Sequence, residues 1–406
     1  MGILMSFFFE RDQDAGMYSY YGIMGLRHRG YKVRYASLKD KEIETGSVNP
    51  WSESWSLMKG YALVAGIEPA SSLGIASASW KKVAVASIGI CNPREVAGVI
   101  ASRKGIEDGA SDVMSKEEVD WCTLVSITSE GEFLAYRGRN SVSPLSVGGY
   151  GFESVYFATE TAAITLMGGE YTHDVKPGEA IYGSRTFLDA QTLKGGKKAT
   201  SLFEYIYLAR PDSYVDGVNV YLFRKDMGSR IARKHDKQID VVAGVPETAL
   251  PYALGYANEK GAPLELSFIS TIGRIRTAVA PLSQEERMMA LSLKLNPVPN
   301  VFEGKSVAIV DDSVVTGLTL KTTIHRLRRA QAAKEVYVVV SSPKIVRGCP
   351  YRLNSIDPSA LIASTLDDEK IMRSLDADGI AWLPLDDAVD YLRSFGIEPC
   401  RRCMKA

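Results

Sequence analysis

The sequence predicts a protein of two domains, a strand-rich α+β domain followed by an α/β domain built on a parallel sheet. The chain has 406 residues, more than one ordinary domain contains. Short apolar segments separated by Gly, Ser and Pro turns fill its first half. After the Gly- and Lys-rich stretch 193–201, strand-like runs alternate with longer helical patterns, as in βαβ units. We therefore predict domains at residues 1–200 and 201–406.

The composition is that of an ordinary soluble globular protein, with 46% apolar and 24% charged residues. Lys+Arg and Asp+Glu both number 48, so the charge gives no reason to expect nucleic acid or an anionic membrane as a partner. No window approaches the roughly 18 to 20 apolar residues of a membrane span. Five cysteines, an odd number spread over the chain, argue against a secreted disulfide framework. We expect a cytoplasmic protein.

The first domain is expected to consist of packed layers of strands. Segments 82–90 and 121–136 carry the short apolar runs that are typical of strands. A helix is expected near Tyr20–Arg29. Cys91 and Cys122 lie in apolar stretches, so we expect them to be core residues.

The second domain contains two well-defined βαβ units. In the first, the strand Ile239–Val245 leads through the turn 246–248 into a helix. Because Leu250, Leu254 and Ala257 recur at helical spacing, we predict that they form the buried face of this helix.

The second unit is built on the run Val307–Val310. This run is short, β-branched and unbroken, which predicts a strand buried on both faces of a parallel sheet. Asp311 and Asp312 follow it directly, and Val336–Val340 is the next expected strand. The helix between the two strands is predicted to bury Leu320, Ile324 and Leu327.

The turn after Asp312 has the features of an anion site. Ligands of open parallel sheets lie beyond the carboxyl ends of the strands. Gly317 lets the backbone approach closely, nearby Ser and Thr hydroxyls donate, and the N–H groups of the following helix favour a phosphate. The turn is not a GxxxxGK[ST] loop, because no Lys follows Gly317.

Asp311 and Asp312 require a different partner, since carboxylates repel a phosphate. Ribose hydroxyls and hydrated Mg²⁺ both suit carboxylate oxygens. A ligand with a sugar diol and a phosphate would therefore occupy the whole turn. The alternative is that the pair only begins a turn and caps the next helix.

At these residues the sequence resembles the phosphoribosyl pyrophosphate signature of type I phosphoribosyltransferases. The segments FEYIYLARPDS, DVVAGVPET, VAIVDDSVVTG and EVYVVVSSP are similar, in order and spacing, to the glutamine phosphoribosyl pyrophosphate amidotransferase (amidophosphoribosyltransferase) family. In the first half, YYGIMGLRHRG, YRGRNSVSPL and VYFATETAAI resemble the glutaminase domain of that family. The resemblance implies an N-terminal nucleophile-type αββα glutaminase-like domain followed by a type I phosphoribosyltransferase domain.

The resemblance also implies a reaction. In this family, ammonia attacks C1 of phosphoribosyl pyrophosphate and displaces pyrophosphate, giving 5-phosphoribosylamine for purine biosynthesis. By position, Thr248, Asp311 and Asp312 match the Mg²⁺-associated residues. The resemblance further implies purine nucleotides as ligands. It also implies an oligomer, either of identical chains or mixed with an active paralogue. The matched binding positions are Pro246, Glu247 and Thr248 in the pyrophosphate loop and Ser313, Val314, Val315, Thr316, Gly317, Leu318 and Thr319 in the 5-phosphate loop.

The glutaminase motifs depart from the family pattern. The family begins with Cys-Gly-Ile and uses that thiolate as nucleophile, whereas Met1 occupies the position here and a thioether supplies no thiolate. The Gly-His-x-Arg-Tyr-Ser segment is matched to residues 74–79, with Ser77 at the Arg that holds the glutamine carboxylate. The oxyanion Asn-Gly pair reads Ile88-Gly89. Only Ser111-Asp112 resembles the substrate-amine contact, so we predict no glutaminase activity.

The closing loop of the second domain is also altered. The family pattern Lys-Asn-Arg-Tyr-x-Gly-Arg-Thr reads STIGRIRT at 270–277, which keeps Arg276 as a candidate catalytic residue together with Thr277. Thr316 and Leu318 replace an Arg and a Thr of the phosphate loop, a milder change because backbone donors remain. Binding is therefore better supported than turnover, since loop closure orders the leaving group.

The C-terminal tail contains a cysteine motif. Cys349, Cys400 and Cys403 resemble three of the four ligands of a [4Fe-4S] cluster found in one branch of the family, with Ser201 at the fourth position. Three alternatives stay open: a cluster with one unusual ligand, a zinc site with a borrowed ligand, or a vestige without metal.

Two functions are consistent with these features. The first is a phosphoribosyltransferase that uses ammonia and has lost glutamine hydrolysis. The second is a non-catalytic regulatory paralogue that binds phosphoribosyl pyrophosphate or nucleotide and partners an active relative. We favour the first, because fold and family define the reaction class while altered site residues affect its rate.

Overall fold

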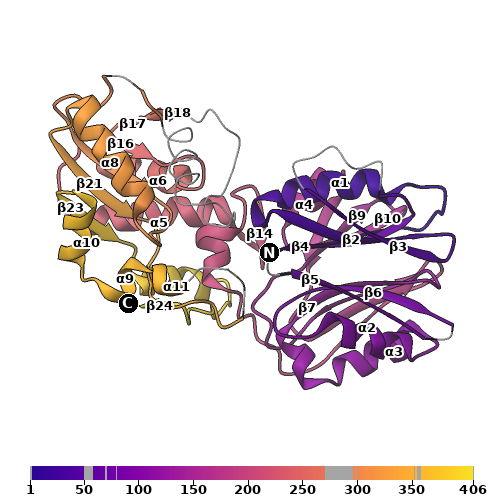
Figure 1. The fold of residues 1–406 in the computed structure, drawn as a ribbon. Helices are drawn as coiled ribbons and strands as arrows, with labels where there is room; N and C mark the ends of the chain where they lie inside the picture. The colour runs from indigo at the N-terminus through magenta and orange to yellow at the C-terminus, as the bar shows by residue number, and fades with distance from the viewer. Residues whose placement is uncertain are drawn as a thin grey trace.

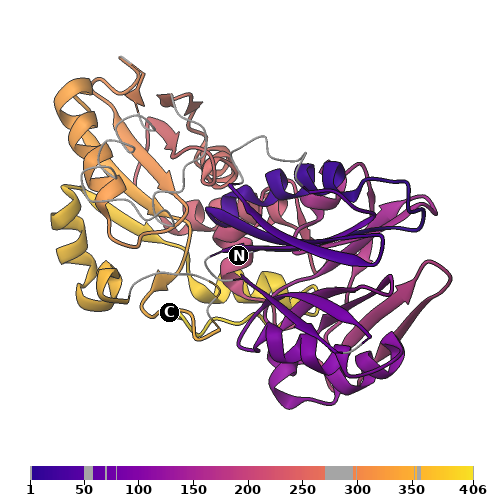
Figure 2. The same cartoon turned by 45° about the vertical axis from the view of Figure 1, so that its right-hand side comes forward.

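The computed structural model shows two domains lying side by side, with the N-terminus at their junction (Figures 1 and 2). Met1, Ser79 and the loop 270–277, to which the sequence assigned roles, lie outside the described residues. In the part of the chain that is described, no helix is long and apolar enough to cross a membrane. The structure describes residues 2–49, 58–68, 71–78, 80–269, 296–298, 300–351, 353 and 358–405.

The first domain is a four-layer αββα sandwich of two antiparallel sheets, as predicted. One sheet has seven strands in the order β11-β9-β10-β1-β4-β2-β3, and the other has six in the order β13-β12-β8-β7-β6-β5. The strands are β1 (Gly2–Phe8), β2 (Lys32–Lys39), β3 (Glu42–Val48), β4 (Ala62–Glu68), β5 (Ser71–Ser77), β6 (Lys82–Ile88), β7 (Thr123–Thr128), β8 (Glu132–Arg137), β9 (Ser146–Tyr150), β10 (Ser154–Ala158), β11 (Glu170–Asp174), β12 (Glu179–Ser184) and β13 (Leu188–Thr192).

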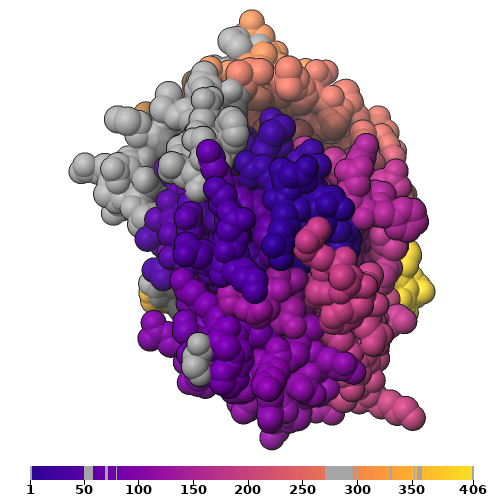
Figure 3. Space-filling view, turned by 90° about the vertical axis from the view of Figure 1, so that its right-hand side faces the viewer, coloured from indigo at the N-terminus to yellow at the C-terminus, as the bar shows by residue number. Residues whose placement is uncertain are grey.

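Helices cover the outer face of each sheet. The first sheet is covered by α1 (Ala15–Leu26) and α4 (Thr161–Leu166), and the second by α2 (Pro93–Ala101) and α3 (Ile106–Met114) (Figure 1). Figure 3 views the first domain from the end that faces away from the second domain. In this view the N-terminal residues, in indigo, lie above the segment that carries α2 and α3. The helix expected at Tyr20–Arg29 begins earlier, because Asp14 caps α1 by accepting the Gly16 N–H at 3.0 Å.

The second domain contains a parallel five-stranded sheet in the order β17-β16-β20-β21-β23. Its strands are β16 (Val241–Gly244), β17 (Leu264–Glu265), β20 (Ser306–Asp311), β21 (Glu335–Val340) and β23 (Gly379–Trp382). Its helices are α5 (Val220–Lys234), α6 (Leu250–Lys260), α8 (Leu318–Gln331), α9 (Ile362–Thr365), α10 (Asp368–Leu375) and α11 (Leu385–Arg393). Two-stranded pairings join β14 (Tyr214–Val215) to β15 (Val218–Asn219), β18 (Phe268–Ile269) to β19 (Asn296–Pro297), and β22 (Lys344–Ile345) to β24 (Met404–Lys405).

The strand β20 is buried on both faces, which confirms the prediction from its sequence. Val307 and Ile309 pack in one core with residues of α8 and α10, while Ala308 and Val310 pack in another with α5, α6 and α11. The predicted stripe of α8 is confirmed, since Leu320, Ile324 and Leu327 are each at most 1% exposed.

The predicted buried face of α6 is wrong in part. Leu250 is 41% exposed, and the large side chains that this helix buries completely are Tyr252 and Tyr256. Two glycines explain why α6 buries a different face from the predicted one. A Cβ at Gly228 of α5 would lie 2.0 Å from the Tyr252 carbonyl oxygen, and one at Gly255 would lie 1.8 Å from the Lys225 carbonyl oxygen. The two helices therefore approach backbone to backbone, a contact that the spacing of Leu residues cannot indicate.

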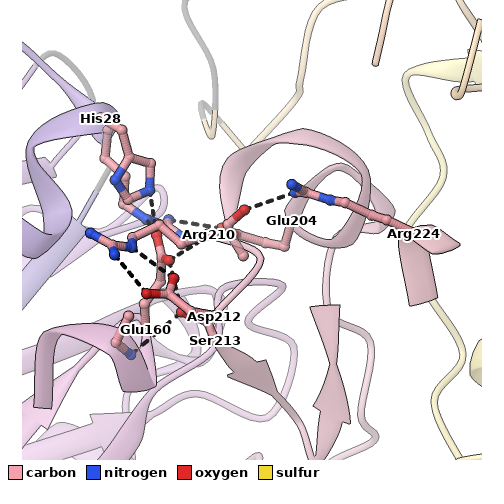
Figure 4. Close-up of polar contacts among 10 residues, drawn as sticks. His28, Glu160, Glu204, Arg210, Asp212, Ser213 and Arg224 are labelled. Atoms are coloured by element: carbon pink, nitrogen blue, oxygen red, sulfur yellow. Dashed lines mark hydrogen bonds and ion pairs between the residues drawn. The ribbon is translucent and has the colours of Figure 1, made fainter. Parts of the chain in front are cut away.

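A buried charge network joins the domains (Figure 4). Glu160 of the first domain is contacted by His28 Nε2 at 2.7 Å and by Arg29 Nε, and it accepts the backbone N–H of Arg210 at 2.7 Å. Arg29 also donates to both carboxylate oxygens of Glu204, which lies on the π-helix Glu204–Leu208 of the second domain. Burial alone raises the pKa of Glu160, but the charges of Arg29 and His28 and these hydrogen bonds bring it well below 4.5.

A second buried ion pair crosses the same junction. Arg137 of β8 donates to both oxygens of Asp216, at 2.6 and 3.0 Å, and to Thr200 Oγ1 at 2.7 Å. The side chains of Arg137 and Asp216 are both 0% exposed. Burial raises the pKa of Asp216, and Arg137 more than offsets this, so the pKa falls below 3.8. The domains are thus joined by charges that water does not reach.

Cys91 and Cys122 are buried, as expected, but they also form a disulfide. The bond links the residues just before α2 to the start of β7, across 31 positions of sequence. Spacing along the chain does not indicate this pairing, because the pairing depends on how two loops pack. Cys349, Cys400 and Cys403 are free thiols.

Candidate functional site

The two loops that the sequence singled out lie next to each other. β16 and β20 are parallel neighbours with Gly244 opposite Val310, and the Val245 N–H donates to the Val310 carbonyl at 2.9 Å. The turn 246–248 and the pair Asp311-Asp312 therefore leave the sheet at the same edge. The peptide bond between Pro246 and Glu247 is cis.

The order of the strands creates a crevice at this edge. β17 follows β16 in the chain and lies beside it at the edge of the sheet. β20, the next strand of this sheet along the chain, lies on the other side of β16. The helices that follow β16 and β20 pack on opposite faces, α6 in one core and α8 in the other. Such a switch point leaves space beyond the carboxyl ends of two adjacent strands, where ligands of open α/β sheets bind.

The acidic pair is held by its own neighbours. Asp311 and Asp312 are each 7% exposed. The Asp312 N–H donates to Asp311 Oδ1 at 2.9 Å, and Ser313 Oγ donates to Asp312 Oδ1 at 2.9 Å. Burial raises the pKa of Tyr252, as does the negative charge of Asp312, which places this carboxylate near α6 as well.

Neither Asp311 nor Asp312 is the N-cap residue of the next helix. α8 begins at Leu318 with Gly317 as its N-cap residue, five positions beyond Asp312, and no N-cap side chain bonds its first turn. Gly317 has a φ of 73°, which favours glycine. Thr316 Oγ1 accepts the Leu318 N–H at 3.3 Å. The first turn of α8 faces the same edge as the acidic pair, as an anion site requires.

The valines of the phosphate turn have a structural role. Val314 is 2% exposed and packs in the core beneath α8, and Val315 is half-buried against the other core. The Val315 carbonyl accepts the Ile362 N–H at 2.8 Å, which ties the turn to the start of α9. Ser313 and Thr319 are half-buried and Thr316 is exposed, so hydroxyl groups remain near the surface of the turn.

The residues matched to the glutaminase motifs lie on different elements of the first domain. Gly2 of β1 lies opposite Ile67 of β4, and Glu68, the last residue of β4, forms an ion pair with Arg34 at 2.6 Å. Gly74 lies on β5 in the other sheet, against the start of α2. Asp112 lies on α3, where it accepts from Arg103 Nε at 2.5 Å.

Ile88 is the last residue of β6, and Gly89 follows it as a half-buried residue. Ile88 is 2% exposed and offers no hydrogen-bond donor from its side chain. Gly89 has a φ of 122°, and a Cβ there would lie 2.4 Å from the Trp121 carbonyl oxygen. The glycine of the matched pair is thus needed for packing, whereas the side-chain donor is absent.

The C-terminal cysteines meet the first residues of the second domain. Ser201 forms a parallel bridge with Cys400, and the Cys400 N–H donates to the Thr200 carbonyl at 3.0 Å. Burial, then the neighbouring Cys349 and Cys400, raise the pKa of Cys403 to about 12. Among the described residues, no group of three or more His, Cys, Asp or Glu side chains is arranged to hold a metal ion. As placed, these thiols do not fit a cluster.

The fold and the edge site together define a phosphoribosyltransferase domain joined to an αββα domain. A phosphoribosyl transferase domain model matches residues 223–350. The chain is 36% identical to the amidophosphoribosyltransferase of Methanocaldococcus jannaschii over 273 residues, which is 63% of this chain and 57% of that protein. It is 32% identical to the amidophosphoribosyltransferase of Archaeoglobus fulgidus over 309 residues, which is 74% of this chain and 66% of that protein.

Solved structures match over the full chain. The glutamine phosphoribosylpyrophosphate amidotransferase of B. subtilis, complexed with ADP and GMP, superposes with a TM-score of 0.80 at 25% identity, covering 100% of this chain and 96% of that one. A structure described as the allosteric regulatory enzyme of purine biosynthesis gives a TM-score of 0.81 at 25% identity, covering 100% and 95%. The chain belongs to the amidophosphoribosyltransferase family. Its sequence matches span less than two thirds of the length of these curated relatives.

Proposed function

We propose that the protein binds phosphoribosyl pyrophosphate with Mg²⁺ at the carboxyl edge of its parallel sheet. It then transfers ammonia to C1, giving 5-phosphoribosylamine for purine biosynthesis, without hydrolysing glutamine itself. The observation that carries this proposal is the meeting of the turn 246–248 with Asp311-Asp312 at the switch point of the sheet. A ligand that spans both loops needs a phosphate at each end and a diol between them.

Each part of this edge has a chemical role in the proposal. The hydroxyls and backbone of 313–319 and the first turn of α8 hold the 5-phosphate. Asp311 and Asp312 accept hydrogen bonds from the ribose hydroxyls. The turn 246–248 holds the pyrophosphate. Together these contacts fix the sugar, so that ammonia meets C1 opposite the leaving group.

The residues at this edge fit Mg²⁺ better than a metal with a full protein cage. Mg²⁺ is typically bound by one or two carboxylates plus substrate phosphates and water. Asp311 and Asp312 supply the carboxylates, and Thr248 is half-buried on the neighbouring loop. When bound with substrate, the ion neutralises charge on the departing pyrophosphate. No iron–sulfur chemistry enters this proposal, because the thiols as placed do not form a ligand set.

Loss of glutamine hydrolysis is inferred from the end of the sandwich beside Gly2. Ile88 stands where the family uses a side-chain donor. An oxyanion site without its donor loses about 10²- to 10³-fold in rate. Ammonia would therefore come from solution or from a partner protein.

Arg276 is the one catalytic residue proposed from sequence alone, since the loop that carries it lies outside the described residues. In the proposal it stabilises the departing pyrophosphate by its positive charge. The changes at Ser270, Ile272 and Gly273 favour the second candidate, a regulatory paralogue that binds the ligand without turnover.

The test is to follow pyrophosphate release from phosphoribosyl pyrophosphate and Mg²⁺ with either ammonium chloride or glutamine. We expect release with ammonium and none with glutamine. A ligand-induced rise in melting temperature without release supports the regulatory paralogue instead. If the ligand neither stabilises the protein nor is consumed, the edge is not a phosphoribosyl pyrophosphate site. Glutamine-driven release would contradict the loss of glutaminase activity.

A further inference from the structure

A cavity of about 720 Å³ opens between the two sheets of the first domain, away from the carboxyl edge of the second. It is bounded by β2 and β3 of one sheet and by β5 and the start of α2 on the other side. We propose that this cavity binds a small phosphorylated organic molecule. The proposal is independent of the proposed function, because it uses no residue of the phosphoribosyltransferase domain.

The charge of the lining selects an anion. Lys32 and Arg34 reach the cavity from β2, and Arg94 reaches it from α2. None of the described residues that line it is acidic. Glu68 pairs with Arg34 at 2.6 Å and lies opposite Lys32 on the neighbouring strand, so part of the positive charge is offset at the edge of the cavity. Like charges gathered on the walls of a concave site raise the local concentration of anions.

The position of Arg94 is set by a close contact between β5 and α2. A Cβ on Gly74 would lie 2.3 Å from the Arg94 backbone nitrogen, so only glycine allows the helix to sit this close. Asn92 caps the helix by accepting the Arg94 N–H at 3.1 Å, and its amide donates to Glu95 at 2.8 Å. The start of α2 thus borders the cavity with Arg94 beside it, and Glu95 in the same first turn offsets part of the positive helix end.

The rest of the lining suits an organic group attached to the phosphate. Thr45, Ser47 and Ser72 place hydroxyls along one part of the wall, and Leu73 and Ile75 supply an apolar part. A mixture of apolar surface and a few polar groups is typical of small-molecule sites, whose volumes run from about 300 to 1,000 Å³. A bare inorganic ion would use only the basic part.

The test is isothermal titration calorimetry with ribose 5-phosphate as the probe and with inorganic phosphate and citrate for comparison. The carboxyl edge also offers a phosphate site, so the titration is run on the Asp312→Asn protein as well as on the wild type. Arg94→Glu and Lys32→Glu reverse the charge of the cavity. Lys104→Glu, an exposed change outside the lining, is the matched control.

We expect ribose 5-phosphate to bind the Asp312→Asn protein, and to bind at least tenfold more weakly when Arg94→Glu is added. Lys104→Glu should leave the affinity unchanged, and circular dichroism should show that every variant is folded. Binding that disappears with Asp312→Asn alone, or that ignores both cavity variants, overturns the proposal. Equal affinity for citrate or for inorganic phosphate would overturn the assignment to a phosphorylated organic molecule.

Discussion

The carboxyl edge of the parallel sheet and the end of the sandwich beside Gly2 have kept different features. At the edge, Asp311 and Asp312 still lie beside the turn 246–248. At the sandwich end the layers are complete and the strands are buried, but Ile88 offers no side-chain donor and Glu68 occupies the strand end. The first region presents carboxylates to a ligand, whereas Ile88 in the second contributes only packing.

This difference shows that fold and site are constrained separately. Core residues and the buried ion pairs at the junction stabilise the whole chain, so changing them costs stability. Polar groups at strand ends contribute chemistry but little packing, so they can change while the fold persists. The presence of the αββα domain is explained by its contacts with the second domain. Buried ion pairs that involve Glu160, Glu204 and Asp216 make these contacts.

The largest expected effect concerns the junction. Glu160→Ala removes a carboxylate partner of the buried Arg29, and removal of one member of a buried pair costs about 3–5 kcal/mol. Urea denaturation would measure the free energy of unfolding. Asp212→Ala is the control, because its side chain is 57% exposed and its pair with Arg210 is worth less than about 1 kcal/mol. Equal losses in the two variants would contradict a stabilising junction.

The next effect tests the edge itself. Asp312→Asn keeps the size of the side chain and removes its charge, so we expect ammonium-dependent pyrophosphate release to fall at least about 100-fold, or about 2.7 kcal/mol. The melting temperature without ligand should change little. Asp386→Asn on the exposed face of α11 is the matched control. If both variants retain full activity, the acidic pair has no part in the reaction.

The disulfide gives a smaller effect on the sandwich. Reduction of Cys91–Cys122 should destabilise the first domain by about 2–3 kcal/mol, because the bond constrains the unfolded chain. Under denaturing conditions without reductant, three thiols per chain should react with a thiol reagent, those of Cys349, Cys400 and Cys403. Five reactive thiols would show that Cys91 and Cys122 are not bonded in the purified protein.

The smallest effect is a pH dependence at the junction. The pKa of Glu160 is well below 4.5 in the folded protein, so its stabilisation is present above about pH 4.5 and is lost as pH falls toward the folded pKa. Asp216 acts in the same direction, whereas Asp174, whose pKa is raised by burial and by Asp216, acts in the opposite one.

Urea denaturation at several values below pH 4.5 measures this dependence. One such group changes the free energy of unfolding by at most about 1.4 kcal/mol per pH unit. The slope should be shallower in Glu160→Gln than in the wild type. Parallel slopes would show that Glu160 does not titrate with unfolding.

Much of the second domain could be predicted from local sequence. The run Val307–Val310 indicated a strand buried on both faces, and the acidic pair at its end indicated the candidate site. Both could be predicted because hydrophobic periodicity and composition are encoded over a few neighbouring residues. The helix α6 was predicted with the wrong buried face, since Gly228 and Gly255 decide how closely it approaches α5. Those contacts join residues that are distant in sequence.

By itself the sequence determined the two-domain fold class, the alternation of strands and helices in the second domain and the acidic pair at a strand end. Only the tertiary structure decided that Glu68 lies at the strand end beside Gly2, that Cys91 reaches Cys122, and that Arg94 and Lys32 share a cavity. The physical reason is that the periodicity of hydrophobic residues specifies a single helix or strand. Strand register and packing depend instead on contacts between distant residues, such as His28 and Glu160, which are 132 positions apart.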